Sequence, residues 1–310
     1  MKALLNDYEQ KRNKAILDLE LRKQTLYSSC KRLEEIENEL NKLSISNAKA
    51  ILLGGISEHS KINALKTERT KLLNTLDKDD SYLKPIFECV SCEDTGYVDG
   101  IMCHCLKQEL LNIKYNKSNI NKLDKENFNT FDETLYSDEI TDGNSPRQNI
   151  LNIKNICLNF IENFDDENEK SLLFTGHSGL GKTFLSNAIA NELLKKEYNV
   201  LYQTSSTLFD TIINYRFGKG NVSTDTYDSI LNVHLLIIDD LGTESLNQTV
   251  LSEIFNVINS RILANKKTII STNLSLNDLY KTYEERILSR IVGYYTICKF
   301  IGDDIRFKKR

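Results

Sequence analysis

Residues 176–183 read Gly-His-Ser-Gly-Leu-Gly-Lys-Thr, and this octapeptide constrains the fold more than any other part of the chain. It follows a short apolar stretch that is typical of a buried strand, and it precedes residues 184–195, which are typical of a helix. In the pattern G-x-x-x-x-G-K-[ST], the glycines let the backbone curl so that its N–H groups face phosphate oxygens. The alternative is a chance match in a glycine-containing turn, which the flanking strand and helix disfavour.

This loop predicts a nucleotide site. Lys182 is expected to reach the β- and γ-phosphates, and Thr183 is expected to supply an oxygen to Mg²⁺. The positive end of the following helix adds to the attraction for phosphate. The predicted nucleotide-binding residues are Gly176, His177, Ser178, Gly179, Leu180, Gly181, Lys182, Thr183 and Phe184.

A second motif supplies carboxylates. Residues 235–238 are Leu-Leu-Ile-Ile, typical of a buried strand, and Asp239 and Asp240 follow directly. We expect Asp239 to enter the Mg²⁺ shell and Asp240 to orient and polarise the attacking water, although its side chain is one methylene shorter than the glutamate that is common at this position. An Asp-Asp turn that merely ends a strand is the alternative. Together the two motifs predict a site for ATP and Mg²⁺ that hydrolyses the nucleotide.

Further polar residues follow along the chain. Thr268–Ser271 is typical of a strand, and Asn273 just beyond it is predicted to hydrogen-bond the attacking water or the γ-phosphate. Arg290 lies on a predicted helix and is a candidate finger that neutralises charge in a neighbouring subunit's site. Arg286, four residues earlier, is an equal candidate for function or for pairing with Glu284 or Glu285 on a solvated face, an alternative that also applies to Arg290. Arg306 is a weaker candidate for a second sensor of the nucleotide.

Four cysteines cluster between the N-terminal region and the phosphate loop: Cys89, Cys92, Cys103 and Cys105. Four thiolates within so short a segment are typical of a closed, structural Zn²⁺ site, and metal would supply much of the folding energy of a module with few large apolar residues. The C-x-C half is less usual than a second C-x-x-C, so His104 is an alternative ligand. Four free or redox-paired cysteines are the other interpretation.

Composition sets the class of protein. The chain has 310 residues, of which 40% are hydrophobic and 27% charged, so we expect two or three folded domains. The formal net charge of −4 argues against nucleic-acid binding by bulk positive charge. No apolar run approaches the ~18 residues of a membrane span, and residues 1–10 lack the apolar core of a signal peptide. We therefore expect a cytoplasmic protein that has no membrane partner.

The first 83 residues are predicted to be helical. Leu5, Leu19, Leu26, Leu33 and Leu40 fall on one heptad register, and an apolar pattern resumes after residues 54–55, Gly-Gly. This predicts two long helices joined by a turn, packed as an antiparallel hairpin or used as a coiled coil that binds a partner. A solvated helical spacer is the alternative.

The sequence divides into four predicted regions. They are a helical, partner-binding region over residues 1–83, a zinc-binding module with a connecting helix over 84–127, a linker and the start of the nucleotide pocket over 128–149, and an ATPase domain over 150–310. The stretch 137–149 is rich in turn formers and is predicted to be a loop or hinge. From residue 150 onward, helical and strand signals alternate, as in a parallel sheet covered by helices.

The order of these parts resembles the bacterial DnaC/DnaI helicase loaders. The resemblance rests on the segments CVSCEDTGYVDGIMCHC, FNTF, GHSGLGKT, LLIIDDLG, STN and ERILSR, which lie between about residues 85 and 310. The core also looks like the IstB transposition ATPases, which share the IDDLG strand but usually lack such a cysteine segment. The fold that the resemblance implies is an α/β AAA+ P-loop NTPase core preceded by a helical coiled-coil hairpin and a small zinc-binding module.

The resemblance also implies function. Such a loader binds the hexameric replicative helicase through its N-terminal region, helps place it on single-stranded DNA, and forms ATP-dependent oligomers with shared sites. The family's catalytic roles then fall on Lys182, Thr183, Asp239, Asp240, Asn273 and Arg290. Residues 128–131 match aromatic residues near the family's nucleotide base, and a core-packing role is equally plausible for them. The chain lacks an obvious C-terminal helical lid, which puts a second sensor in doubt.

The same resemblance places a DNA-facing helix between the second strand and the acidic strand, over residues 208–230. Arg216 and Lys219 with Tyr215 and Phe217 suit single-stranded DNA, because basic groups bind phosphates and aromatic rings stack on bases. A surface helix with scattered charge is the bland alternative. Because the chain is acidic overall, we expect DNA binding to be weak or gained on assembly. Two rival functions stay open: an IstB-like transposition helper, and a nucleotide-gated adaptor that scarcely hydrolyses ATP.

Overall fold

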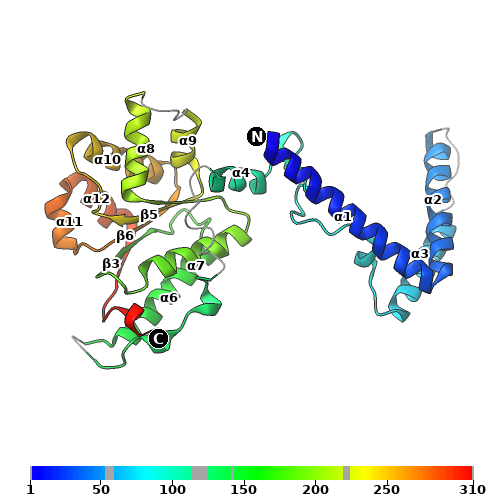
Figure 1. The fold of residues 1–310 in the computed structure, drawn as a ribbon, viewed down its shortest axis with the longest axis horizontal. Coiled ribbons are helices and arrows are strands. Elements are labelled where there is room, and N and C mark those ends of the chain that lie inside the picture. The colour runs from blue at the N-terminus through cyan, green and yellow to red at the C-terminus, as the bar shows by residue number, and fades with distance from the viewer. Residues whose placement is uncertain (1, 53–58, 114–124, 141–142, 219–223, 309–310) are drawn as a thin grey trace. The chain divides into compact units, whose positions relative to one another are not determined.

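The computed structural model describes residues 2–52, 59–113, 125–140, 143–218 and 224–308 (Figure 1). The chain forms two compact units, Met1–Cys103 and His104–Arg310, and each is described by itself. The first unit contains the helices α1 (Lys2–Ser29), α2 (Lys31–Leu52) and α3 (His59–Thr75), the short 3₁₀ helix η1 (Asp80–Leu83), and the two-residue strands β1 (Tyr97–Val98) and β2 (Ile101–Met102).

The predicted N-terminal helical region is confirmed, but its first helix is interrupted. The heptad pattern predicts one helix up to residues 54–55, whereas the structure ends α1 at Ser29 and starts α2 at Lys31. Cys30 accepts a hydrogen bond from the N–H of Leu33 (3.1 Å), which is a tighter turn than that of an α-helix. The leucine register runs through this turn, so periodicity alone could not reveal it. Residues 54–55 lie outside the described residues.

Helices α2 and α3 form the antiparallel hairpin. Leu33 near the start of α2 packs with Leu73 near the end of α3, whereas Leu40 packs with Leu65, so the two helices run in opposite directions. Arg32 also pairs with Glu68 (2.8 Å), and Arg69 pairs with Glu37 (3.0 Å). Between the two rows of charges the apolar side chains are buried. They are Leu33, Ile36, Leu40, Leu65 and Leu73. Burial of this stripe is what holds two short helices together in water.

The second unit is built on a parallel sheet, as the alternating helix and strand signals predict. Its five strands lie in the order β4-β5-β6-β3-β7. They are β3 (Ser171–Thr175), β4 (Val200–Thr204), β5 (Leu235–Leu241), β6 (Lys267–Thr272) and β7 (Tyr295–Lys299). All four pairings are parallel. The predicted α/β core is therefore confirmed.

Helices cover both faces of this sheet (Figure 1). They are α4 (His104–Leu111), α6 (Pro146–Glu162), α7 (Lys182–Lys195), α8 (Ser205–Arg216), α9 (Thr224–Asn232), α10 (Gln248–Leu263), α11 (Leu276–Thr282) and α12 (Glu285–Tyr294). Short 3₁₀ helices lie at η3 (Phe128–Thr130), η4 (Glu133–Leu135) and η5 (Ile305–Phe307). Because side chains alternate along a strand, Leu172 and Phe174 pack toward α6 and α7, whereas Leu173 packs toward the other helices.

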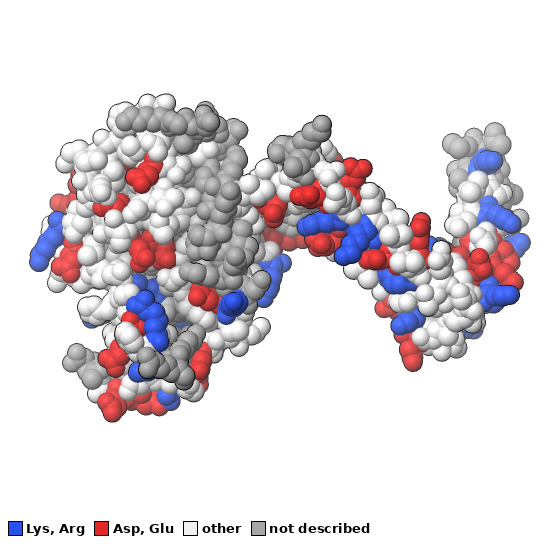
Figure 2. All heavy atoms as spheres, viewed as in Figure 1, with Lys and Arg blue, Asp and Glu red and all other residues white. Residues whose placement is uncertain are grey.

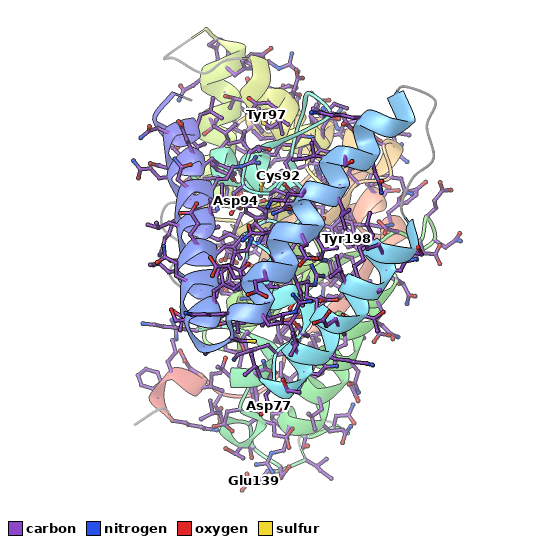
Figure 3. The ribbon with its side chains drawn as sticks, turned by 90° about the vertical axis from the view of Figure 1, so that its right-hand side faces the viewer. Asp77, Cys92, Asp94, Tyr97, Glu139 and Tyr198 are labelled. Atoms are coloured by element: carbon purple, nitrogen blue, oxygen red, sulfur yellow. The ribbon has the colours of Figure 1, made fainter. Side chains whose placement is uncertain are left out.

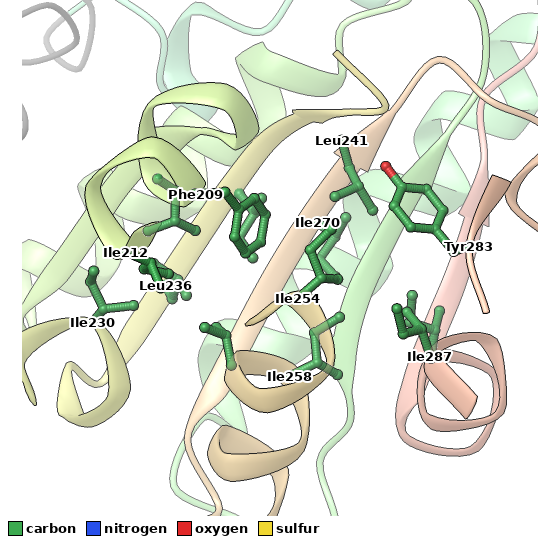
Figure 4. Packing of buried hydrophobic residues seen from close by; sticks show 14 of the residues in the cluster. Phe209, Ile212, Ile230, Leu236, Leu241, Ile254, Ile258, Ile270, Tyr283 and Ile287 are labelled. Carbon is green, nitrogen blue, oxygen red and sulfur yellow. The ribbon is translucent and has the colours of Figure 1, made fainter. Parts of the chain in front are cut away.

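The core on the second face joins β5 and β6 to helices α8 to α12 (Figure 4). Leu236 and Ile270 extend from the strands toward Phe209, Ile254 and Ile287 on the helices, and all five side chains are at most 1% exposed. Burying side chains of this size is worth roughly 1.5–3 kcal/mol each. This packing fixes the strands whose ends carry the polar motifs.

Helix α6 begins earlier than the sequence predicts. The stretch 137–149 is predicted to be a loop, but α6 already begins at Pro146. Ser145 caps the helix by accepting the N–H of Gln148, and proline suits the first helical position, so these turn formers start a helix instead.

Helix α4 pairs with the outer edge of β4. The Gln108 side chain of α4 accepts the N–H of Val200 (2.9 Å) and donates to the carbonyl of the same residue (3.0 Å).

The surface charge is mixed. Lys and Arg side chains are interspersed with Asp and Glu on the face in view (Figure 2), consistent with a net charge near zero for a chain of this length. Among the described helices, none combines the length and the apolar character that a membrane span requires.

Candidate nucleotide-binding site

The phosphate loop and the acidic motif meet at one edge of the sheet. The loop follows β3, the carboxylates end β5, and β6 lies between these two strands. Since the strands are parallel, their carboxyl ends lie at the same edge, where ligands of α/β proteins bind. Asn273, directly after β6, therefore lies between Lys182 and Asp240, and all three line one cavity.

The Lys182 side chain is held by hydrogen bonds to the phosphate loop. Its ammonium group donates to the carbonyls of Gly176 (2.6 Å) and His177 (2.7 Å) and to Oδ1 of Asn273 (2.8 Å). Burial lowers the pKa of Lys182, while Asp240 and Asp239 oppose this shift. Gly181, in a left-handed conformation (φ 94°), precedes the lysine and opens α7, so the N-terminal N–H groups of the helix point into the site.

Asp239 is held in place by three hydroxyl groups. It is 5% exposed and accepts hydrogen bonds from Thr183 Oγ1 (3.2 Å), from the Ser271 hydroxyl and from the Tyr202 hydroxyl. Burial, and then the charge of Asp239, raises the pKa of the Tyr202 hydroxyl, so this group stays a proton donor. Thr183 and Asp239 thus present two oxygen ligands side by side.

Asp240 departs from regular strand geometry. Its φ is +55°, and the pairing of β5 with β6 shifts register between Ile238 and Leu241. A left-handed conformation is uncommon for a residue with a Cβ, although aspartate adopts it more readily than most, and such residues gather at functional sites. The bulge turns Asp240 into the cavity instead of along the strand. Burial, and then the charge of Asp239, raises the pKa of Asp240, whereas Lys182 lowers it.

The cavity has a volume of about 360 Å³, within the range of small-ligand sites. Its lining residues are Glu126, Ser178, Gly179, Gly181, Lys182, Thr183, Phe184, Asp240, Asn273, Ile305 and Arg306. The donor set fits a polyphosphate, because a lysine, an arginine and a helix N-terminus face one hollow. It also fits Mg²⁺, a hard cation that prefers carboxylate and hydroxyl oxygens.

Residues 304–306 lie on the phosphate loop. Ile305 donates its N–H to the carbonyl of Gly179 (3.0 Å), and Arg306 bonds the Ser178 hydroxyl (2.9 Å) and Asp304 (2.6 Å). A Cβ on Gly179 would come within 2.0 Å of the Asp304 carboxyl carbon, so only glycine fits there. The sequence indicates Arg306 only weakly, and no motif marks Asp304.

The aromatic residues of the FNTF segment lie near this site. Phe131 stacks on Tyr136 (ring centroids 6.3 Å apart) and packs against Phe184 (6.0 Å). Tyr136 donates its hydroxyl to the carbonyl of Leu180 beneath the phosphate loop (3.1 Å), and Phe128 packs against the same core. These rings pack between the phosphate loop and the core. This is the core-packing role that the sequence offers as an alternative to contact with the nucleotide base.

The candidate arginines differ in their contacts. Arg286 pairs with Glu284 (2.5 Å) and lies over the Phe255 ring (4.6 Å), which is the local pairing that the sequence offers as an alternative. Arg290 lies on the same helix, half-exposed, and the described residues give it no ion pair. It is not among the residues that line the cavity of its own chain.

The helix assigned to DNA contact is two helices, α8 and α9. Arg216 at the end of α8 pairs with the buried Glu253 (2.9 Å) and lies over the Tyr227 ring (5.8 Å). Tyr227 in turn stacks on Tyr215. Lys219 lies outside the described residues. Arg216 is thus engaged within the fold, while Phe217 is 60% exposed.

The four cysteines form a separate cluster. The sulfur atoms of Cys89, Cys92, Cys103 and Cys105 all lie within 4.8 Å of one another. Cys89 and Cys103 are 3.8 Å apart at sulfur, which matches the edge of about 3.8 Å expected for a tetrahedron with Zn–S bonds of about 2.3 Å. The donor set and its spacing therefore fit Zn²⁺. His104 lies 3.6 Å from Glu197, and the cluster comprises cysteines alone.

Backbone and carboxylate groups orient these thiols. Asp94 is 2% exposed and accepts the N–H groups of Cys89 (2.8 Å) and Glu88 (2.9 Å), while Gly96 donates its N–H to the sulfur of Cys92 (3.3 Å). Figure 3 labels Cys92 and Asp94 in this turn. Glu93 and Asp94 both have positive φ, which curls the loop around the sulfur atoms.

Sequence reasoning missed Tyr202 and Ser271 as partners of Asp239. A signal for Tyr202 exists, because strand alternation places it on the same face as Val200, toward α7. Its reach to Asp239 depends on β4 lying next to β5, which no local pattern encodes. Ser271 lies in the predicted strand before Asn273. Its hydroxyl group reaches Asp239 because β6 pairs with β5, and this pairing is not visible in the local sequence.

The chain is similar to several known ATP-binding and replication proteins. The chain is 31% identical to the replicative helicase loader DnaC of Escherichia coli K12 over 134 residues, 43% of this chain and 54% of DnaC. It is 32% identical to the replicative helicase loader DnaI of Bacillus subtilis over 135 residues, 41% and 42% of the two chains. It is 28% identical to the insertion sequence ATP-binding protein y4pL of Sinorhizobium fredii over 145 residues, 45% and 58%. The chain thus spans about half the length of these relatives.

Among solved structures, the crystal structure of the DnaC helicase loader aligns with a TM-score of 0.48 and 25% identity, covering 58% of this chain and 99% of that one. The predicted relation to AAA+ ATPases of the DnaC/DnaI and IstB type is confirmed. The model of the IstB-like ATP binding protein family matches residues 99–310, well over half of the sequence. The chain therefore belongs to the family of IstB-like ATP binding proteins.

Proposed function

We propose that this protein hydrolyses ATP and uses the nucleotide cycle to place a hexameric replicative DNA helicase on single-stranded DNA. The observation that carries the proposal is the cavity at the sheet edge that Lys182, Thr183 and Asp240 line. The similarity of the chain to two proteins named replicative helicase loaders supports it. We propose that the N-terminal unit, with its helical hairpin, contacts the helicase, and that residues 128–310 carry the ATPase.

The proposed chemistry is in-line attack of water on the γ-phosphate. Lys182 leaves its carbonyl partners and neutralises charge on the β- and γ-phosphates. Asp240, turned into the cavity by the bulge, accepts a hydrogen bond from the attacking water and polarises it, and Asn273 orients the same water. Burial and the charge of Asp239 raise the pKa of Asp240, which makes it a better proton acceptor than an ordinary carboxylate.

Thr183 and Asp239 are the residues that would hold Mg²⁺. The ion supplies charge neutralisation of the phosphates as they react. Tyr202 and Ser271 keep Asp239 in place through their hydroxyl groups. This arrangement keeps the Asp239 carboxylate next to the Thr183 hydroxyl, so that two oxygen ligands face the same point, as an oxygen-ligated cation requires.

Copurification tests the helicase as partner. We expect the full chain to retain the replicative helicase of the same organism in the presence of ATP and Mg²⁺. Lys182→Ala, which removes the phosphate contact, is expected to change the nucleotide dependence of this retention and to abolish nucleotide binding by calorimetry. Absence of the helicase at every nucleotide condition would contradict the loader function.

A transposition helper is the second candidate, because the family model and the y4pL protein both point to insertion sequences. Such a helper would bind duplex DNA and a transposase. Titration of the ATP-bound chain with single-stranded and with duplex oligonucleotides separates the two: a preference for single strands, weak in the monomer and stronger on ATP-dependent assembly, supports a loader. A preference for duplex supports the helper.

A nucleotide-gated adaptor with little hydrolysis is the third candidate. Steady-state ATPase of the wild type against Asp240→Asn decides this point, because the substitution removes the carboxylate that polarises water and leaves the phosphate loop intact. Equal rates would favour the adaptor. A lower rate in the variant with unchanged ATP affinity would show that the site hydrolyses ATP through Asp240.

We also propose that the cysteine cluster binds one structural Zn²⁺ through Cys89, Cys92, Cys103 and Cys105. Support comes from the sulfur spacing and the oriented thiols. Metal analysis of the purified chain is expected to give one zinc equivalent, lost in Cys92→Ser. Cys30→Ser is the matched control outside the cluster and is expected to keep the metal. A zinc-free wild type would contradict the assignment.

A further inference from the structure

One buried carboxylate has no place in the site described so far. Glu244 lies four residues after Asp240 and is 9% exposed. Three neutral donors hold it: the N–H of Gly242 (2.9 Å), the Ser205 hydroxyl (2.5 Å) and the Tyr283 hydroxyl. A buried carboxylate is costly unless its oxygens are hydrogen-bonded, so this arrangement is specific rather than incidental.

The three donors come from three different elements. Gly242 belongs to the turn after β5, Ser205 is the first residue of α8, and Tyr283 caps the end of α11 just before α12. Ser205 is fully buried and Tyr283 is 3% exposed, so neither side chain has a solvent alternative. The carboxylate also lies at the N-terminus of α8, where the helix dipole favours negative charge. Glu244 thus joins the acidic strand end to both neighbouring helical segments.

The turn that Glu244 anchors is the turn that carries Asp240. Thr243 donates its N–H (3.3 Å) and its hydroxyl (2.9 Å) to the Asp240 carbonyl, and Thr272 donates its hydroxyl to the Leu241 carbonyl (2.6 Å). Gly242 has φ 109°, and a Cβ there would come within 2.9 Å of Leu274. These contacts hold the turn on the C-terminal side of Asp240, while the Ser271 hydroxyl accepts the Asp240 N–H on its other side (3.0 Å).

We infer that Glu244 is a positioning residue for ATP hydrolysis, acting through Asp240. It fixes the turn that directs the Asp240 carboxylate into the nucleotide cavity, and it ties that turn to Tyr283 before the helix that bears Arg290. The inference rests on the proposed ATPase function. Among the described residues, the donors to Glu244 are Gly242, Ser205 and Tyr283, which all lie outside the phosphate loop, so we expect Glu244 to affect the rate of hydrolysis and not the affinity for nucleotide.

The test is a comparison of kcat, KM and ATP affinity for Glu244→Gln, Glu244→Ala and Tyr283→Phe in the full chain. Displacing a catalytic group by about 1 Å costs on the order of 100-fold in rate, so we expect kcat to fall by about 10- to 100-fold in Glu244→Ala with ATP affinity within two-fold of the wild type. Tyr283→Phe deletes one hydroxyl and is expected to fold and to lose about 10-fold or less. Wild-type kcat in both Glu244→Ala and Glu244→Gln would overturn the inference.

Two controls separate positioning from general loss of structure. Glu253→Gln alters another buried glutamate of the same core, 4% exposed and paired with Arg216, and is expected to lower Tm without lowering kcat. In an Asp240→Asn background, Glu244→Gln is expected to cause no further loss of rate, because it acts through Asp240. Additive losses would show an independent structural effect and overturn the inference. If the wild type itself binds no ATP, the proposed function fails instead.

Discussion

At the scale of single residues, the second unit relies on buried polar groups whose partners are backbone carbonyls. Arg261 is fully buried and donates to the carbonyls of Ile230, Leu231, Val233 and Lys267 and to the Thr268 hydroxyl. Burial lowers the pKa of Arg261 to about 9, so the guanidinium is still charged at neutral pH. The Arg261 side chain thus links the C-terminal end of α9 and the residue after it to the start of β6.

Arg261→Met is therefore expected to destabilise the second unit by about 3–5 kcal/mol, because it keeps the length of the side chain but leaves several buried carbonyls without donors. Chemical denaturation measures the change. Lys195→Met is the matched control, since Lys195 makes an exposed pair with Glu192, and its effect is expected within about 0.5 kcal/mol. A neutral Arg261→Met would show that the carbonyls find other donors.

His234 predicts a pH dependence of stability. Its Nδ1 accepts the N–H of Asn199 (3.0 Å), so the ring must be neutral at that atom, and burial, followed by the charges of Lys266 and Lys107, lowers its pKa from 6.5. The unfolded state then binds more protons, so the stabilisation is present above about pH 6.5 and is lost as the pH falls.

We expect thermal unfolding of the wild type to lose roughly 2–4 °C more than His234→Asn between pH 7.5 and pH 5.5, the change in Tm that corresponds to about 1 kcal/mol from one hydrogen bond. Asparagine offers an acceptor oxygen near the position of Nδ1 but does not titrate. Identical pH profiles would mean that His234 does not couple protonation to folding.

At the scale of elements, the helical hairpin depends on a narrow apolar stripe. Leu33 and Leu73 are fully buried between α2, α3 and the end of α1. Leu33→Ala is expected to destabilise this unit by about 2–5 kcal/mol through lost burial and a residual cavity. Leu21→Ala is the control, because Leu21 is 53% exposed. Hydrogen exchange of peptides from α2 and α3 measures the effect, and equal protection in the two variants would contradict it.

The elements that could be predicted are those whose signal is local. The phosphate loop, the strand before Asp239 and the helix after Lys182 are each encoded by a short pattern of glycine, apolar and charged residues. The break at Cys30 was missed because the leucine register continues through it, and the start of α6 was missed because Ser145 and Pro146 suit a loop and a helix start equally.

The parts of the site that could not be predicted depend on neighbours distant in sequence. Tyr202, Glu244 and Asp304 take their positions from strand order and from chain segments that fold back on the loop. Each is an ordinary polar residue in its local context. Only the three-dimensional arrangement shows that Asp240 lines the cavity from a bulge with a left-handed backbone, next to the turn that Glu244 holds.

At the scale of the whole molecule, we expect the active form to be an assembly with shared sites. Arg290 has no ion pair within the described chain and does not line its own cavity, so its proposed partner is the nucleotide of a second copy. Arg290→Ala and Lys182→Ala are each expected to abolish most of the ATPase activity. Mixed in equal amounts, they are expected to restore about a quarter of the sites, since heterologous interfaces form at random.

The measurement is ATPase rate against the mixing ratio, and Arg286→Ala is the control because Arg286 is paired with Glu284 in its own chain. Mixtures of Arg286→Ala with wild type are expected to show no such complementation pattern. A flat, inactive profile for the Arg290→Ala and Lys182→Ala mixture would argue against a finger that acts between copies.

The contact of Gln108 with Val200 has a consequence for solubility. An outer strand with unsatisfied N–H and C=O groups is a template on which another chain can add a strand and start aggregation. The amide of Gln108 satisfies both backbone groups of Val200, which caps the β4 margin as a further strand would. We therefore expect the helix that follows the cysteines to block the addition of a strand at Val200, a role that is separate from binding nucleotide.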